Sequence, residues 1–148
     1  MKLSGGKRMT VEELYAITGS YNAHNIIEKL GIIVTEVSFS VLNELAICDP
    51  QQGLIFIRND LSNNLHEFAL DHEIGHIVMH NDIQSPLYMS GNKSKIEKQA
   101  NDFAIELVAK NHKIPEEQVV KYLNDTFPFL KLNNKKTRCV NNVSENVI

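Results

Sequence analysis

The sequence predicts an α+β fold in which a small, mostly antiparallel sheet packs against two long helices. Short runs rich in β-branched residues cluster in the first half of the chain, and longer helical patterns fill the second half. The 148 residues are enough for one compact domain with its own hydrophobic core. We expect this single domain to span residues 1–130, followed by a flexible tail over residues 131–148, which is rich in Asn and Lys.

Two short helices are expected before the sheet. Thr10 and Glu13 have the spacing of a capping box, so the first helix should run from about Val11 to Thr18. The second helix should cover about Asn22 to Leu30 and stop at Gly31, because glycine readily adopts the left-handed conformation that ends helices.

Three strands are expected between residues 32 and 58. The β-branched run Ile32–Val37 predicts the first strand, and Leu45–Cys48 and Leu54–Arg58 predict the other two. Pro50 and Gly53 supply the backbone angles that a turn requires. The last two strands should therefore form a hairpin.

Helices are expected in the rest of the domain. Asn64 offers a cap for a helix from Leu65 to about His80, and a second long helix should run from about Ser94 to Asn111. A final helix should open at Pro115 and end near Asn124. In the second long helix, one face at helical spacing should pack inward, formed by Ile96, Ala100, Phe103 and Leu107.

The segment His72-Glu73-Ile74-Gly75-His76 is a candidate metal site. Residues four apart lie on the same face of a helix, so the imidazoles of His72 and His76 can reach one ion. Zinc commonly takes three protein ligands in catalytic sites and keeps a fourth position for water. Glu73 lies beside a ligand, where it can accept a proton from a water molecule that zinc has made more acidic.

The third ligand is expected from the second long helix. Glu97 and Glu106 are nine residues apart, and at roughly 100° per residue they point to opposite sides of this helix. Ala100 and Ala104 follow Glu97 at helical spacing and would let the two helices approach closely, which favours Glu97. Asn101, one turn after Glu97, could accept a hydrogen bond from a ligand imidazole.

Two further residues are candidates for supporting roles. His80 lies eight residues after His72, a rise of about 12 Å, so both cannot bind one ion. His80 could line the cleft, donate a hydrogen bond to substrate or serve as a structural histidine. Tyr88, in the loop that follows, could stabilise an oxyanion, although tyrosine is just as often a packing residue.

Charge and hydropathy argue against other classes of function. The formal net charge of −3 gives no general attraction to phosphate backbones, so direct nucleic-acid binding is not expected. No apolar run has the length of a membrane span, and the basic N-terminal residues lack the apolar stretch of a secretory signal. Cys48 and Cys139 have no metal-ligand spacing, which suits a reducing compartment. We therefore expect a cytoplasmic protein without a membrane role.

The two long helices resemble the ImmA/IrrE family of metallopeptidases, also called the IrrE N-terminal-like domain. The resemblance covers roughly residues 22–107 and rests on Phe68–His76, with His80 following, and on Ile96–Leu107. It implies a minimal zincin fold of the gluzincin type, a small sheet flanked by helices. It also implies zinc binding by two histidines and a glutamate, and a glutamate as catalytic base. These roles fall on His72, His76, Glu97 and Glu73.

One segment departs from the family pattern. Many members read Leu-Leu-Met-Pro after the second motif, whereas this chain reads Leu107-Val108-Ala109-Lys110. Because proline ends helices and lysine does not, the second long helix should run on further here.

The first functional hypothesis is a zinc-dependent endopeptidase with one Zn²⁺ per chain. The resemblance implies that its protein substrate is a helix-turn-helix transcriptional repressor of a mobile element, such as a phage, or of a stress operon. The second hypothesis is a catalytically silent metal-binding module that inactivates a repressor by docking. Two histidines and one carboxylate also occur in non-haem iron enzymes, but the motif spacing and the resemblance favour zinc.

Overall fold

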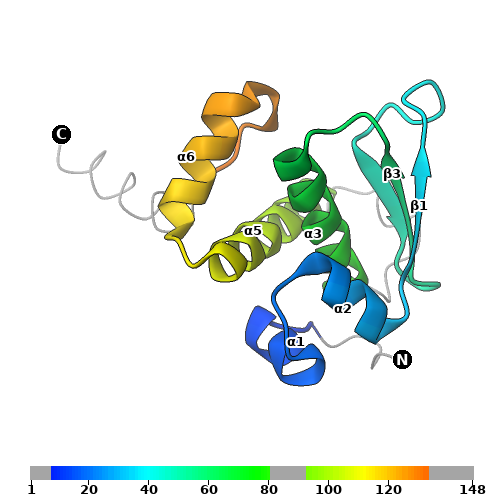
Figure 1. Ribbon diagram of the computed structural model, residues 1–148, viewed down its shortest axis with the longest axis vertical. Helices are drawn as coiled ribbons and strands as arrows, with labels where there is room; N and C mark the ends of the chain where they lie inside the picture. The colour runs from blue at the N-terminus through cyan, green and yellow to red at the C-terminus, as the bar shows by residue number, and fades with distance from the viewer. Residues whose placement is uncertain (1–7, 81–92, 134–148) are drawn as a thin grey trace, which may run out of the picture.

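The computed structural model of the protein describes residues 8–80 and 93–133. Within these ranges the fold is α+β, as predicted, with five α-helices, one short 3-10 helix and a three-stranded sheet. Figure 1 shows the helices gathered on one side of the sheet, with the long helices in the middle of the molecule. None of the described helices is long and apolar enough to cross a membrane.

The first two helices have nearly the predicted bounds. Helix α1 (Val11–Thr18) begins with the expected capping box, in which Thr10 Oγ1 accepts the Glu13 N–H at 3.1 Å and Glu13 Oε1 accepts the Thr10 N–H at 2.9 Å. Helix α2 (Ala23–Leu30) ends at Gly31, whose φ of 70° is left-handed. This turn leads the chain directly into the sheet.

The sheet contains the three predicted strands in the order β1-β3-β2. Strands β2 (Ala46–Asp49) and β3 (Leu54–Arg58) form the expected antiparallel hairpin. Strand β1 (Ile33–Val37) pairs with β3 in parallel, so the sheet is mixed and the expectation of mostly antiparallel pairing is corrected. The physical reason is the long connection over residues 38–45. It lets β2 begin one strand position away from β1, so β3 takes the place between them and runs parallel to β1.

The two long helices pack against each other and against the sheet. Helix α3 (Asn63–Met79) begins after Ser62, so the expected cap at Asn64 is wrong. Asn64 lies inside the first turn, and its side-chain amide donates to the hydroxyl of Tyr122 at 2.6 Å. Helix α5 (Lys93–His112) continues through the segment that departs from the family pattern, as expected.

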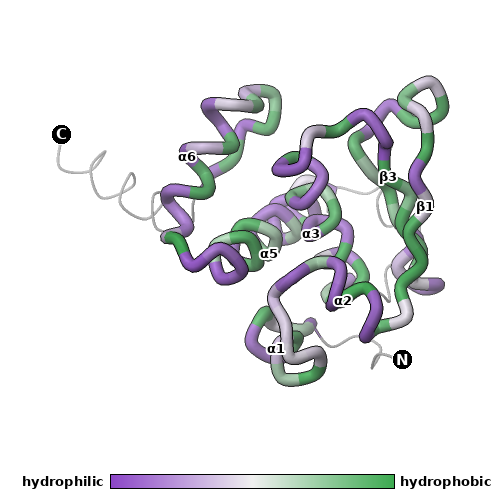
Figure 2. Tube along the Cα trace, in the orientation of Figure 1, coloured by the Kyte–Doolittle hydropathy of each residue, from purple (hydrophilic) through white to green (hydrophobic). Residues whose placement is uncertain are grey.

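The C-terminal part of the described chain covers α5. Helix α6 (Glu116–Thr126) packs against α5 and is followed by the 3-10 helix η1 (Pro128–Leu130). Figure 2 shows hydrophobic and hydrophilic segments alternating along α6, as expected for a helix with one buried face. Leu132 is buried, and its backbone N–H and carbonyl bond to the side chain of Asn124, so packing continues past the predicted boundary at residue 130. Residues 134–148 of the expected tail lie outside the described ranges.

The main core lies between the inner face of the sheet, α3 and α5. Ile55 and Ile57 of β3 are fully buried, as is Ile74 of α3. The predicted inward face of α5 is confirmed, because all four of its residues are buried: Ile96, Ala100, Phe103 and Leu107. This core holds the polar faces of α3 and α5 at fixed positions relative to each other.

Candidate metal centre

Helix α3 presents the polar residues of its motif toward α5 and the sheet. The Nε2 atoms of His72 and His76, one turn apart, are separated by 3.1 Å. Glu73 lies beside them, with its Oε2 4.0 Å from His72 Nε2. Glu73 and His76 are buried, and the side chain of His72 is only 14% exposed. These three side chains therefore share one sheltered region.

Helix α5 supplies a carboxylate to the same point. Glu97 Oε1 lies 3.0 Å from His72 Nε2, and Glu97 Oε2 lies 3.1 Å from His76 Nε2. Glu106 instead interacts with Lys110. The pKa of Lys110 is raised mainly by its hydrogen bond to Glu12, and the negative charge of Glu106 raises it as well. The structure therefore places Glu97, rather than Glu106, beside the two histidines.

The donor atoms of His72, His76 and Glu97 suit a metal ion. One ligand atom from each lies within 4.8 Å of the other two, and residues 8–80 and 93–133 contain no other such group. Two Nε2 lone pairs that face each other repel unless a proton or a cation lies between them. Two imidazole nitrogens and one carboxylate are a common zinc ligand set that leaves a fourth position for water. The residues therefore fit one zinc ion.

Charge interactions within this group are strong. Burial alone would raise the pKa of Glu97, but hydrogen bonds from His72 and His76 hold it well below its usual range. Burial alone would lower the pKa of His72, but the hydrogen bond to Glu97 and the charge of Glu73 raise it.

The far side of each ligand imidazole also has a partner. His72 Nδ1 lies 2.8 Å from Asn101 Oδ1, the contact expected from the sequence. His76 Nδ1 lies 3.2 Å from Nδ1 of His80, whose Nε2 lies 2.9 Å from Gln99 Oε1. His80 is only 2% exposed, and burial lowers its pKa. Its buried imidazole therefore lies behind His76.

Strand β2 forms the wall beside Glu73. Its Cys48 faces the core, where burial raises the pKa of the thiol. The negative charge of Glu73 and a hydrogen bond between the two side chains raise this pKa further. Cys48 is therefore a neutral neighbour of Glu73. Its isolated position in the sequence gave no signal for this contact, because only the pairing of β2 with β3 fixes its orientation.

Gly75 explains how α3 and α5 come close enough to share the centre. A Cβ atom added at Gly75 would lie 3.2 Å from Cδ1 and 3.3 Å from Cβ of Phe103. These distances are shorter than ordinary van der Waals contacts, so the absent side chain lets Phe103 pack directly on the backbone of α3. The glycine thereby places Glu97, on the same helix as Phe103, within reach of the histidines.

A groove of about 780 Å³ adjoins the centre at Asn101. It lies between the N-terminal end of α3 and the segment that follows α6. Its lining includes the apolar side chains of Leu65, Phe127, Phe129 and Leu130. Leu65 precedes His72 by two helical turns on α3, so the groove continues the face that carries the candidate metal ligands.

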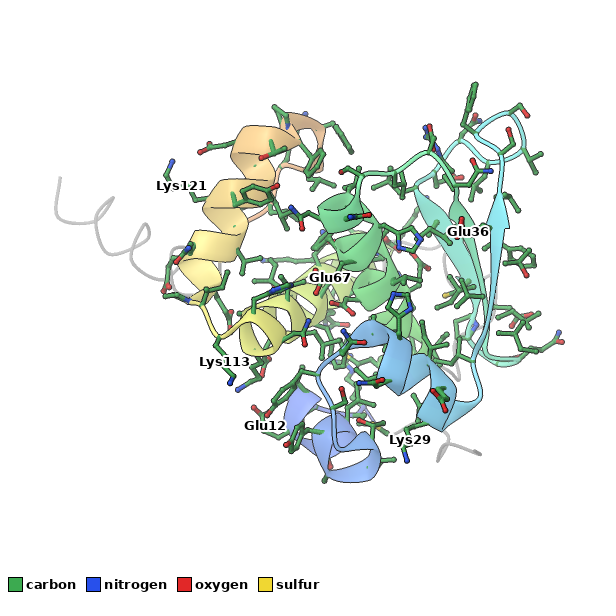
Figure 3. The ribbon with its side chains drawn as sticks, in the orientation of Figure 1. Glu12, Lys29, Glu36, Glu67, Lys113 and Lys121 are labelled. Atoms are coloured by element: carbon green, nitrogen blue, oxygen red, sulfur yellow. The ribbon has the colours of Figure 1, made fainter. Side chains whose placement is uncertain are left out.

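A second polar cluster joins α3 and α5 at the other end of their contact. Glu67, labelled in Figure 3 where the two helices meet, accepts hydrogen bonds from His112 Nε2 at 2.8 Å and from Asn111 Nδ2 at 3.2 Å. His112 is 47% exposed. Both contacts pair a nitrogen donor with a carboxylate oxygen, so Glu67 is satisfied by hydrogen bonds.

Tyr88, the candidate oxyanion stabiliser, lies outside the described residues. Helical spacing does not single out Gln99, which is only two positions from Glu97 and so does not share its face of the helix. A polar residue two positions from a ligand, facing the end of the motif helix, is the signal that could have identified it.

Comparison with known proteins supplies the family. Residues 27–146 match Peptidase_M78, described as the IrrE N-terminal-like domain. A search of curated proteins finds no match. The matched range includes the motif helix α3 and helix α5, which together carry the candidate metal ligands. The chain therefore belongs to the Peptidase_M78 family, the family of the IrrE N-terminal-like domain.

Proposed function

We propose that this protein is a zinc-dependent endopeptidase. The observation that carries the proposal is the convergence of His72, His76 and Glu97 on one point, with the buried carboxylate of Glu73 beside them. This arrangement supplies three metal ligands and a separate acid-base group. Membership in a metallopeptidase family supports the same reading.

The proposed chemistry assigns each residue a role. When bound, zinc supplies Lewis acidity, which polarises a peptide carbonyl and makes a water molecule more acidic. Glu73 takes one proton from the attacking water and later gives a proton to the leaving amine nitrogen, so the peptide bond is replaced by a carboxyl group and an amine. The buried wall formed by Cys48 keeps bulk water away from one side of Glu73. His72, His76 and Glu97 would hold the zinc ion.

We further propose that the substrate is a helix-turn-helix transcriptional repressor of a mobile element or a stress operon. This proposal rests on the family resemblance. The groove beside Asn101 supports a protein substrate, because its volume and apolar lining can accommodate side chains of an extended peptide. A docking module without turnover is the competing function.

Substitution of Glu73 by Gln separates cleavage from docking. We expect Glu73→Gln to keep zinc and repressor binding, because it retains the size of the side chain and leaves all three ligands in place. Repressor cleavage should fall by at least about 100-fold, the scale of a lost general base. The assay would follow the purified repressor from the same mobile element or operon by mass spectrometry, with Glu67→Gln as the matched control on the same helix. If Glu73→Gln still cleaves or inactivates the repressor, the endopeptidase proposal is rejected.

A further inference from the structure

His80 and Gln99 form a polar pair behind the metal ligand His76. His80 is the C-cap residue that follows α3, and its backbone N–H donates to the carbonyl of His76 at 2.8 Å. Its buried imidazole lies 5.4 Å from that of His76, measured between ring centroids. The side chain of Gln99 reaches it from α5, with Oε1 2.9 Å from His80 Nε2.

The positions of the protons along this chain follow from the contacts. His76 Nε2 faces His72 and Glu97, so as a metal ligand it must keep its lone pair on this atom. A neutral imidazole carries one proton, which for His76 is then on Nδ1. Two Nδ1 atoms lie 3.2 Å apart, so His80 Nδ1 must be the acceptor. The proton of His80 is therefore on Nε2, from which it donates to Gln99 Oε1.

We propose that His80 and Gln99 are positioning residues that hold His76 in the tautomer and orientation needed to bind zinc. The inference rests on the proposed zinc site and deepens it. An acceptor behind a ligand histidine makes that ligand more basic, and removing such a partner typically weakens metal binding by about 10–100-fold. Asn101 has the equivalent contact behind His72, so α5 supports both ligand imidazoles, directly in one case and through His80 in the other.

A purely structural role of His80 would give a different result. If His80 only ended the helix and filled space, an apolar residue of similar size would replace it without changing zinc affinity. If it acts as an acceptor, the replacement must supply an acceptor near the position of Nδ1. Asparagine does so through its side-chain oxygen, and leucine does not.

The experiment compares His80→Leu with His80→Asn in the full chain. The dissociation constant for Zn²⁺ would be measured by competition with a zinc-binding dye. We expect His80→Leu to weaken zinc binding by about 10–100-fold and His80→Asn to remain within about 3-fold of wild type. We expect Gln99→Leu to weaken binding less, and Gln99→Glu to preserve it. The control pair is His112→Leu and His112→Asn, which should both leave zinc affinity unchanged.

The outcomes separate this inference from the proposed function. Wild-type protein that fails to bind zinc rejects both. Zinc binding with equal affinity in wild type and His80→Leu, or equal losses in the Leu and Asn variants, overturns the positioning role alone. Nitrogen-15 NMR of zinc-loaded wild type gives an independent test if a variant does not fold. It should show a bare Nδ1 and a protonated Nε2 on His80, and the reverse tautomer would overturn the proposal.

Discussion

Helices α3 and α5 bring histidine, carboxylate and asparagine side chains together at two places. At one end, Glu67 accepts hydrogen bonds from His112 and Asn111, so the nitrogen donors there meet a carboxylate acceptor. At the other end, His72 and His76 point their Nε2 atoms at each other and at Glu97. The residue types are the same, but only the second group directs several lone pairs at one point. The arrangement of donors and acceptors, rather than composition, distinguishes the candidate metal centre from a surface ion pair.

The largest expected difference between the two places is in metal content. We expect wild type to retain one zinc per chain after exhaustive dialysis, measured by elemental analysis. Glu97→Ala should weaken zinc binding by more than about 100-fold, because loss of a ligand exceeds the 10–100-fold effect of losing an outer partner. Glu67→Ala is the matched control and should retain the zinc. Full retention in Glu97→Ala would show that Glu97 is not a ligand.

Asp71 lies on α3 between the two places and belongs to neither. It is fully buried, and its carboxylate oxygens have no hydrogen-bond partner among the described residues. Burial raises its pKa well above the usual range, with a further contribution from the charge of Glu67. We expect Asp71→Ala to raise the free energy of unfolding at pH 7 by about 1 kcal/mol, because an unsatisfied polar group costs about 1–3 kcal/mol.

Urea denaturation at pH 7 and pH 5 would test this prediction. A group with a raised folded pKa favours folding at low pH and loses this contribution as pH rises through the folded pKa. The increase in the free energy of unfolding caused by Asp71→Ala should therefore be smaller at pH 5 than at pH 7. A loss of stability in this variant at pH 7 would mean that the carboxyl group has a favourable partner.

The pH dependence of the stability of the metal-free protein should also distinguish the His72–Glu97 end of the helix pair from the Glu67 end. The folded pKa of Glu97 is depressed, so its contribution is present above its ordinary value of 4.5 and is lost as pH falls. The folded pKa of His72 is raised, so its contribution is present below its ordinary value of 6.5 and is lost as pH rises. Their combined stabilisation should be greatest between pH 4.5 and 6.5.

The effect should be under about 1 kcal/mol, because the side chain of Glu97 is 38% exposed and solvent screens the pair. Urea denaturation of wild type and Glu97→Gln across this range would measure it. The difference in the free energy of unfolding between wild type and Glu97→Gln should be largest between pH 4.5 and 6.5. A difference that does not vary with pH would contradict the assigned ion pair.

The smallest expected effect concerns the exposed ion pair between His112 and Glu67. His112→Ala should change the free energy of unfolding by no more than about 0.5 kcal/mol, because exposed ion pairs contribute little. Thermal unfolding at neutral pH would measure the change, and zinc content should not alter. A loss of more than 2 kcal/mol, on the scale of buried pairs, would show that the Glu67 cluster stabilises the fold more than an exposed ion pair does.

Local sequence signals predicted most of the fold. The capping box at Thr10 and the left-handed glycine at Gly31 act within a few residues, so the helices they bound were predicted closely. The cap of α3 was misplaced because Ser62 and Asn64 are both suitable, and only the contact of Asn64 with Tyr122 on a distant helix decides between them. The parallel pairing of β1 also depends on a contact between segments separated in sequence.

By itself, the sequence determined the elements whose cause is local periodicity. It placed two histidines one turn apart, put Glu73 between them, and favoured Glu97 through the small residues that follow it. The tertiary structure decided which groups stand behind these ligands. Gln99 reaches His80, and Cys48 reaches Glu73, only because α5 and β2 are packed against α3 in one particular orientation. Spacing along one helix fixes the directions in which its side chains point, whereas contacts between helices and strands depend on how the core packs.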